Sequence, residues 1–241
     1  RKQAEPFSSA HASDAWWSSS LSDHSDLNTS THARQAQRMA RELADEIARL
    51  NDNPDPFRTE AANAREMSER FERKRAQINN QLKKVEQSYE AEKKLAESEL
   101  NSLLPQDDTQ RSSEIRAYFR QLGDSERQMK LQEAIRAGDS ETVGAVTGAP
   151  AYLSGFTGEQ QAHAVESYQD THAPAAVEQR KAVGKARELA NGASVDVTEY
   201  GLSYVDYETL NSAEKQEKQR QGEPEGGDEG GNGSGVPGGI A

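Results

Sequence analysis

The stretch FERKRAQINNQLKKVEQSY, residues 71–89, spaces its large apolar side chains at steps of seven, four, three and four. These side chains are Phe71, Ile78, Leu82, Val85 and Tyr89. Such steps are typical of the seam of a short coiled coil, because residues at this spacing share one face of a helix. The partner of the seam is either another helix of this chain or a second subunit. The five residues are therefore candidate partner contacts as well as candidate core.

The helix that carries this seam is predicted to run from about Phe57 to Leu104. At 1.5 Å per residue it would be a rod of about 70 Å, which cannot bury an apolar stripe by itself. The heptad pattern weakens towards the end, where Glu92 and Glu99 fall on core positions. We expect a long central helix that needs a neighbour along its whole length.

A second helix is predicted immediately upstream. Leu43, Ile47 and Leu50 follow helical spacing, and the Pro- and Asx-rich run 51–56 favours a turn. Residues 31–104 are therefore expected to form a helical hairpin built around the long helix.

Shorter helices are predicted over residues 112–192. Thr157 and Gln160 have the spacing of a capping box, which starts one helix, and Pro174 can occupy the first turn of the next. These two helices with their short joint predict a small C-terminal helical hairpin.

Residues 193–211 show a different period. Val195 and Val197 alternate with polar residues, which is typical of a strand or an extended segment. A lone strand is unstable, so we expect this segment to lie along a neighbour. Its candidate partner-binding residues are Tyr200, Leu202, Tyr204 and Tyr207.

Both ends of the chain are predicted to be extended arms. Residues 1–30 are rich in Ser, Asp and His, and they contain the adjacent pair Trp16 and Trp17. These tryptophans either fold back onto the chain's own helices or anchor the arm on a partner, since tryptophan is enriched at binding hot spots. Residues 212–241 are charged and then Gly-rich, which is typical of a flexible tail.

Composition agrees with a mainly α, elongated protein rather than one large globule. Only 33% of the 241 residues are hydrophobic, and mean hydropathy is −0.99. The 41 acidic residues outnumber the 29 basic ones, and the basic residues near Arg73 alternate with acids. Phosphate binding depends on concentrated positive charge, so direct nucleic-acid binding is not expected. No run approaches the roughly 18 apolar residues of a membrane span, and we expect no membrane partner.

The sequence predicts no enzyme and no cofactor. The chain contains no cysteine, and it has neither a phosphate-binding glycine loop nor a His-Glu-x-x-His metal motif. Ser154-Gly155 lacks the flanking glycines of a nucleophile elbow, because Tyr152 and Phe156 occupy those positions. We therefore predict no catalytic, cofactor-binding or metal-ligating residues.

One stretch resembles a family. Ala149-Pro150, Leu153-Ser154-Gly155-Phe156-Thr157 and Glu159, followed by His172-Ala173-Pro174, resemble small proteins encoded in the structural-gene clusters of tailed bacteriophages and prophages. The similar pattern there is A-P-x-x-L-S-G-[LF]-T-x-E followed, after one helix, by H-A-P. It covers about 45 residues of the chain. The resemblance implies a virion or head-assembly context and says nothing about mechanism.

The function expected from these features is a non-enzymatic structural component of a phage particle, associated with the head, portal or tail. Its expected partners are other virion proteins, such as capsid, portal or connector subunits, and further copies of itself. Its expected location is the virion, after synthesis in the cytoplasm of the host bacterium. Two alternatives stay open: a scaffolding or assembly-chaperone protein, and a cellular coiled-coil adaptor.

Overall fold

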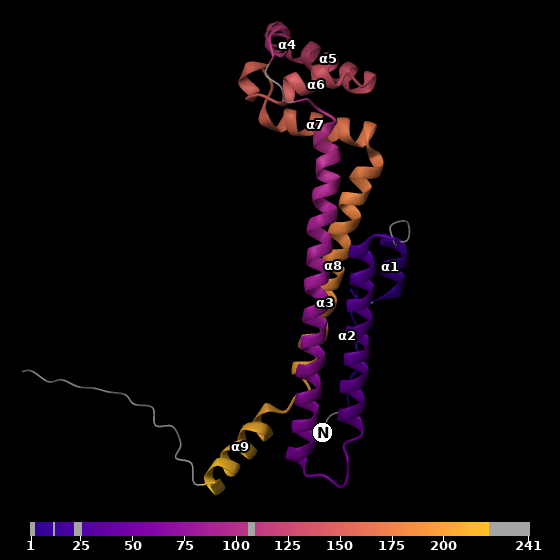
Figure 1. The fold of residues 1–241 in the computed structure, drawn as a ribbon, viewed down its shortest axis with the longest axis vertical. Helices are drawn as coiled ribbons and strands as arrows, with labels where there is room; N and C mark the ends of the chain where they lie inside the picture. The colour runs from indigo at the N-terminus through magenta and orange to yellow at the C-terminus, as the bar shows by residue number, and fades with distance from the viewer. Residues whose placement is uncertain (1–2, 12, 22–25, 106–108, 222–241) are drawn as a thin grey trace, which may run out of the picture.

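The computed structural model describes residues 3–11, 13–21, 26–105 and 109–221, and within them all regular structure is helical. In chain order the elements are α1 (Asp14–Leu21), α2 (Asn28–Asp52), α3 (Glu60–Ser102), α4 (Gln110–Gln121), α5 (Asp124–Ala137), α6 (Ser140–Thr147), η2 (Ala151–Leu153), α7 (Gly158–His172), α8 (Pro174–Leu202) and α9 (Tyr207–Gln221). Figure 1 shows an elongated molecule with a narrow shaft, a head at one end and α9 at the other.

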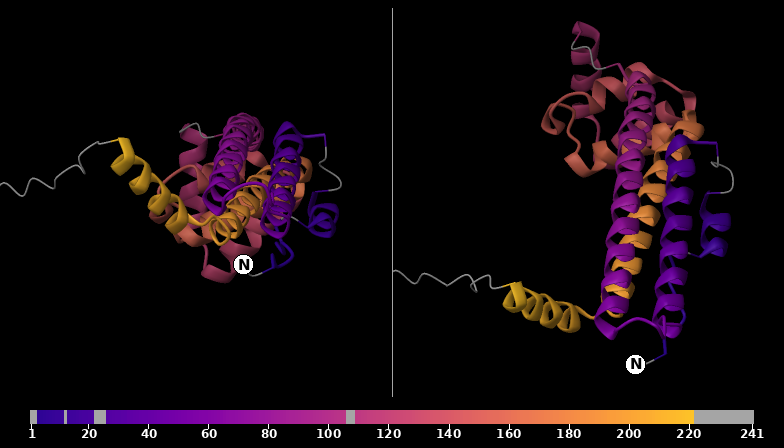
Figure 2. Two further views of the ribbon diagram at one scale, coloured as in Figure 1. Left: turned by 90° about the horizontal axis from the view of Figure 1, so that it is seen from below. Right: turned by 60° about the horizontal axis from the view of Figure 1, so that its bottom comes forward.

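The shaft is a bundle of α2, α3 and α8, which lie side by side in all views (Figures 1 and 2). α3 and α8 extend beyond α2 to the head. The lower part of the shaft buries Leu43 and Ile47 of α2, Phe71 and Ile78 of α3, and Val197 of α8. Because these residues recur every three or four positions on each helix, each helix presents one apolar face to the other two.

Local signals set the helix ends in the shaft. Thr59 caps α3 by accepting a hydrogen bond from the backbone N–H of Ala62 at 3.2 Å. The turn between α2 and α3 contains Pro54 and Pro56, and the Asp55 backbone is tied to Asn63 by hydrogen bonds. α2 and α3 therefore form the helical hairpin that the sequence predicts.

The head consists of α4 to α7 with η2 and has a separate core. Phe119, Leu131, Val146, Phe156 and Tyr168 are buried together there. The predicted capping box at Thr157 and Gln160 is present in full at the start of α7. α5 ends at Gly138, whose φ of 72° lies in the left-handed region that favours glycine.

The mainly helical class, the long helix and the C-terminal pair of helices joined at Pro174 are confirmed. The second helix of that pair, α8, is longer than expected. It leaves the head and forms one side of the shaft down to Leu202, so residues 174–192 belong to the shaft and not to the short-helix subdomain.

The prediction of an extended segment over residues 193–211 is wrong. Residues 193–202 continue α8, and α9 begins at Tyr207. Leu189, Ala193, Val197 and Gly201 are all buried at steps of four, whereas Val195 is 55% exposed. The short alternation of valines concealed this helical period, because a helix places Val197 and Val195 on different faces.

The predicted limits of the arms also change. The segment 1–30 contains a helix, α1, and α2 begins at Asn28, before residue 31. At the other end, residues 212–221 belong to α9. The Gly-rich part of the predicted tail, residues 222–241, lies outside the described residues.

Candidate partner-binding surfaces

The N-terminal arm lies against the lower shaft. The backbone N–H of Glu5 donates to the Tyr204 hydroxyl at 2.8 Å, and the Tyr200 hydroxyl donates to the backbone carbonyl of Glu5 at 2.8 Å. The ring of Phe7 packs edge-on against Tyr200, with centroids 5.2 Å apart. Tyr200 and Tyr204 therefore contact the chain's own arm, whereas the sequence suggested that they belong to an extended strand lying on a partner.

Further along, the arm contacts α8 through Asp196. Its carboxylate oxygen Oδ2 lies 2.9 Å from His11 Nδ1 and accepts a hydrogen bond from the Ser9 hydroxyl. The serine proton is thus directed at the carboxylate, whereas a hydrolytic triad directs it at the imidazole. The imidazole of His11 lies over Gly192, where an added Cβ would come within 2.4 Å of the ring. These contacts are consistent with a packing role for the group.

Trp17 lies in the core of the protein. It is only 3% exposed, its indole N–H donates to the His11 carbonyl at 3.1 Å, and it packs with Ala186 and Leu189 of α8. This geometry matches the alternative in which the tryptophan folds back onto the chain's own helices. The side chain of Trp16, the other predicted anchor, lies outside the described residues.

The seam residues of α3 face the other helices of the shaft. Phe71, Ile78 and Val85 are almost fully buried inside the chain, and Leu82 is partly buried beside them. Tyr89 lies at the edge of the seam, where the guanidinium of Arg187 is 4.5 Å from its ring centroid. The chain's own α2 and α8 therefore occupy the face that the sequence assigned either to them or to a second subunit.

Leu202 and Tyr207, the remaining predicted contacts, lie near the joint between α8 and α9. Leu202 is 46% exposed and Tyr207 39% exposed. Burial of the phenol against α3 raises the pKa of Tyr207. Of the predicted site residues with described side chains, these two remain most accessible to a partner.

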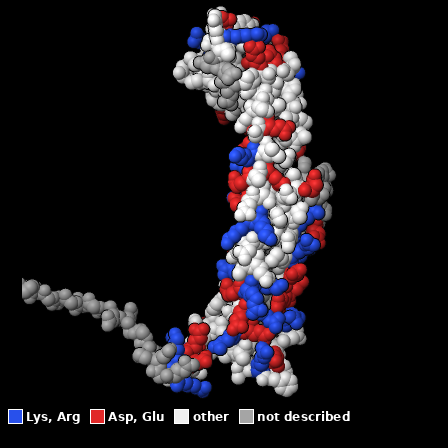
Figure 3. All heavy atoms as spheres, viewed as in Figure 1, with Lys and Arg blue, Asp and Glu red and all other residues white. Residues whose placement is uncertain are grey.

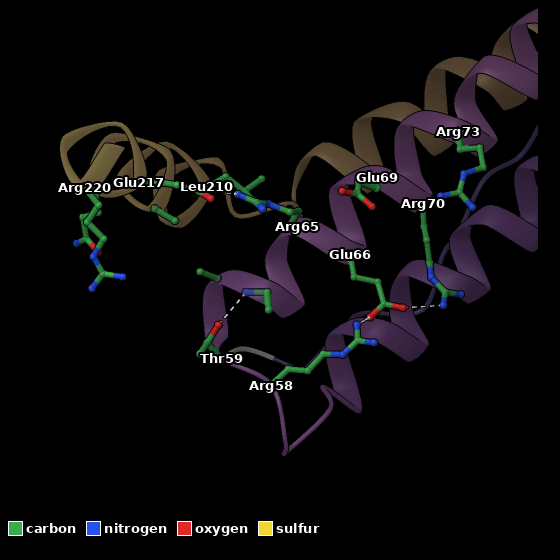
Figure 4. A pocket seen from close by; sticks show the side chains of 14 residues that line it. Arg58, Thr59, Arg65, Glu66, Glu69, Arg70, Arg73, Leu210, Glu217 and Arg220 are labelled. Carbon is green, nitrogen blue, oxygen red and sulfur yellow. Dashed lines mark hydrogen bonds and ion pairs between the residues drawn. The ribbon is translucent and has the colours of Figure 1, made fainter. Parts of the chain in front are cut away.

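A groove that the sequence did not reveal separates α9 from the first turns of α3 (Figure 4). It has a volume of about 1090 Å³. Its walls carry five arginines and three glutamates: Arg58, Arg65, Arg70, Arg73, Arg220, Glu66, Glu69 and Glu217. Leu210 is its largest apolar residue. The sequence does contain a signal for α9, the helix that forms one wall of the groove. The Asp206 carboxylate accepts a hydrogen bond from the backbone N–H of Thr209 and so caps the start of this helix.

Several of these arginines are paired. Hydrogen bonds to the carboxylates of Glu46, at 2.9 Å, and Glu66, at 2.6 Å, raise the pKa of the Arg70 guanidinium. Arg65 of α3 lies 3.2 Å from Glu217 of α9 and joins the two walls of the groove. Along the rest of the shaft, acidic and basic side chains alternate over the surface, as Figure 3 shows for one face.

Large apolar side chains are exposed mainly at the two ends of the molecule. Phe57, in the turn between α2 and α3, is 97% exposed and lies at the base with Leu202 and Tyr207. In the head, Tyr152 is 73% exposed, and Tyr118 and Met129 are about half exposed. Leu95 and Val195 are the corresponding residues of the shaft among those that the structure describes.

Comparison with protein-family models, with curated proteins and with solved structures finds no match for this chain. Within the described ranges, no helix is both long and apolar enough to cross a membrane. The same part of the chain contains no cluster of three or more His, Asp or Glu side chains suited to a metal ion.

Proposed function

We propose that this protein is a non-enzymatic structural component of a phage particle that connects neighbouring subunits through the two ends of a rigid helical shaft. The observation that carries the proposal is the position of its exposed apolar side chains. Phe57 at the base and Tyr152 in the head are the most exposed of them. Aromatic side chains in such positions are typical anchors of protein–protein contacts.

The shaft supports a spacer role. The 43 residues of α3 correspond to about 65 Å at 1.5 Å per residue, so the two ends can reach different partners. Three-helix packing along the lower shaft, with the arm laid over it, restricts bending between the ends. The assignment to a virion is supported only by the resemblance over about residues 148–191.

Changing the two exposed aromatic residues tests the spacer role. We expect Phe57→Ser and Tyr152→Ser to reduce incorporation into assembling particles severalfold while the melting temperature stays unchanged, because neither ring is buried. Leu95→Ser is the matched control, since Leu95 is 65% exposed but lies in the shaft. Equal incorporation of all three variants would rule out contacts through the ends.

A scaffolding or assembly-chaperone protein is the second candidate, favoured by α9, a highly charged helix that projects sideways from the base of the shaft (Figure 2). Mass spectrometry of mature particles separates the two. A structural component is retained at a fixed copy number, whereas a scaffold is absent or cleaved. Absence from assembling particles as well would favour the cellular adaptor.

A further inference from the structure

The groove between α3 and α9 contains positive charge that the described part of the chain does not neutralise. Arg73 on α3 and Arg220 on α9 line it, and neither forms an ion pair with any described residue. Arg58, Arg65 and Arg70 each have a carboxylate partner. Glu69 also lines the groove without such a pair, so the unpaired side chains of the groove carry an excess of one positive charge. Although the protein has a net charge of −12, the unpaired arginines of this groove can attract an acidic segment electrostatically.

The sequence supplies such a segment next to the groove. Residues 222–241 begin directly after α9, whose last turn contributes Arg220 to the groove. They include four acidic residues within seven positions, Glu223, Glu225, Asp228 and Glu229, and no lysine or arginine. Gly222, directly before this acidic run, permits the change of direction that a return along α3 requires.

The dimensions of the two elements agree. The groove follows α3 from Thr59 to Arg73, which at 1.5 Å per residue is about 21 Å. In extended form, the seven residues Glu223 to Glu229 reach about 23 Å. The acidic run can therefore span the wall that carries Arg58, Arg65 and Arg73.

We propose that this groove is the docking site of the chain's own acidic C-terminal segment, residues 222–241. Exposed ion pairs are individually weak and are screened by salt. A tethered segment needs little affinity, however, because a short link gives an effective concentration in the millimolar range. The groove is thus filled by its own chain at low ionic strength and opens as salt increases. This proposal does not depend on the virion assignment.

The absence of cysteine from the chain makes a direct test possible. A spin label at Gly230→Cys, next to Glu229, should reduce the amide NMR signals of residues 61–73 severalfold in the isotopically labelled full-length protein. The signals of the head should be unaffected. At about 1 M NaCl, where the Debye length falls to about 3 Å, the signals of 61–73 should recover.

Charge reversal provides the matched control. Arg73→Glu with Arg220→Glu should abolish the signal loss, whereas Arg120→Glu with Arg136→Glu, an equal charge change on exposed residues of the head, should preserve it. Circular dichroism checks that both variants keep their helices. Persistence of the signal loss after reversal of the groove charges would overturn the proposal.

A mixture separates the chain's own segment from that of a second copy. Spin-labelled protein without isotope is mixed with isotopically labelled protein without spin label. In this mixture the spin label and the observed amides are on different chains. If the signals of residues 61–73 are nevertheless lost, the occupant is the segment of another copy, and the proposal of a contact within one chain fails. It fails equally if the labelled chain shows no loss at low salt. Neither result bears on the contacts proposed for Phe57 and Tyr152.

Discussion

Glu92 on α3 caps the start of α2 through Thr29. Its carboxylate accepts a hydrogen bond from the Thr29 backbone N–H at 3.1 Å and another from the Thr29 hydroxyl at 2.6 Å, and it also accepts from the backbone N–H of Asn28 at 2.8 Å. The first N–H groups of a helix have no partner within the helix, and a carboxylate stabilises that positive end. A side chain of one shaft helix therefore sets where its neighbour begins.

Removal of this cap should destabilise the shaft. We expect Glu92→Ala to lower the free energy of unfolding by about 1–2 kcal/mol, the usual effect of losing a helix cap. Urea unfolding followed by circular dichroism measures it. Glu90→Ala removes the same charge two residues away on an exposed position, and it should change stability by less than about 0.5 kcal/mol. Equal effects would mean that general charge, and not the cap, is responsible.

Alanine at Gly192 should release the N-terminal arm, since the new Cβ would lie within 2.4 Å of the His11 ring. Limited proteolysis and amide exchange of residues 4–11 measure the release. Gly184→Ala is the control on the same helix, because its Cβ would meet nothing within 4 Å. That change should stabilise the protein by about 0.5–1 kcal/mol through helix propensity. A Gly192→Ala variant that gains the same stability with a protected arm would contradict the observed packing.

Truncation of the seam should affect the single chain and not only its association. Phe71 is fully buried against α2 and α8. Its ring lies so close to Gly201 of α8 that a Cβ added there by alanine would come within 2.2 Å of it. We expect Phe71→Ala to cost about 3–5 kcal/mol, whereas Leu95→Ala, at an exposed position, should cost less than about 0.5 kcal/mol. Melting temperatures should not depend on protein concentration. A strong dependence would place the seam between subunits.

High pH should weaken the attachment of the arm. Burial, reinforced by the nearby Tyr204, raises the pKa of Tyr200 above its ordinary value of 10.0. The folded state thus disfavours the ionised phenol. The stability that the buried, protonated phenol of Tyr200 contributes is fully present below pH 10, where the unfolded chain is also protonated. It is lost as pH rises through the higher pKa of the folded state. Spectrophotometric titration should show raised pKa values for Tyr200 and Tyr207. The Tyr200 component should disappear in Tyr200→Phe, whereas both components should persist in Tyr152→Phe, a change at an exposed site in the head.

Glu92 also shows why one sequence prediction needed the structure. Glu92 occupies a core position of the heptad, where a charged residue indicates an interruption of the apolar seam. The structure shows that α2 starts beside it, so this position faces the end of a helix and not the side of one. Thr29, the partner of Glu92, lies 63 residues away in the sequence. The heptad pattern of α3 contains no information on where α2 begins.

Some of the candidate surfaces could likewise be recognised in the sequence, whereas others required the structure. Trp17 and the seam residues could be recognised as buried or interfacial from their type and spacing, and both alternatives were open. The groove between α3 and α9 could not be predicted, because it depends on the Arg65–Glu217 contact between positions 152 residues apart. Residues of the stretch Gly148–Pro174 pack inside the head: Ser154 is fully buried, and His172 Nε2 lies 2.6 Å from the Ile135 carbonyl at the end of α5.

The sequence by itself determined the helical class, the long helix, and the joint at Pro174, because helix spacing, caps and proline act within a few residues along the chain. Only the tertiary structure decided what covers each helix face. The contact of His11 with Asp196 joins residues 185 positions apart, and Gly192 and Gly201, which resemble helix breakers in the sequence, admit His11 and Phe71 between closely packed elements. Such contacts depend on the relative positions of whole helices, which local preferences do not specify.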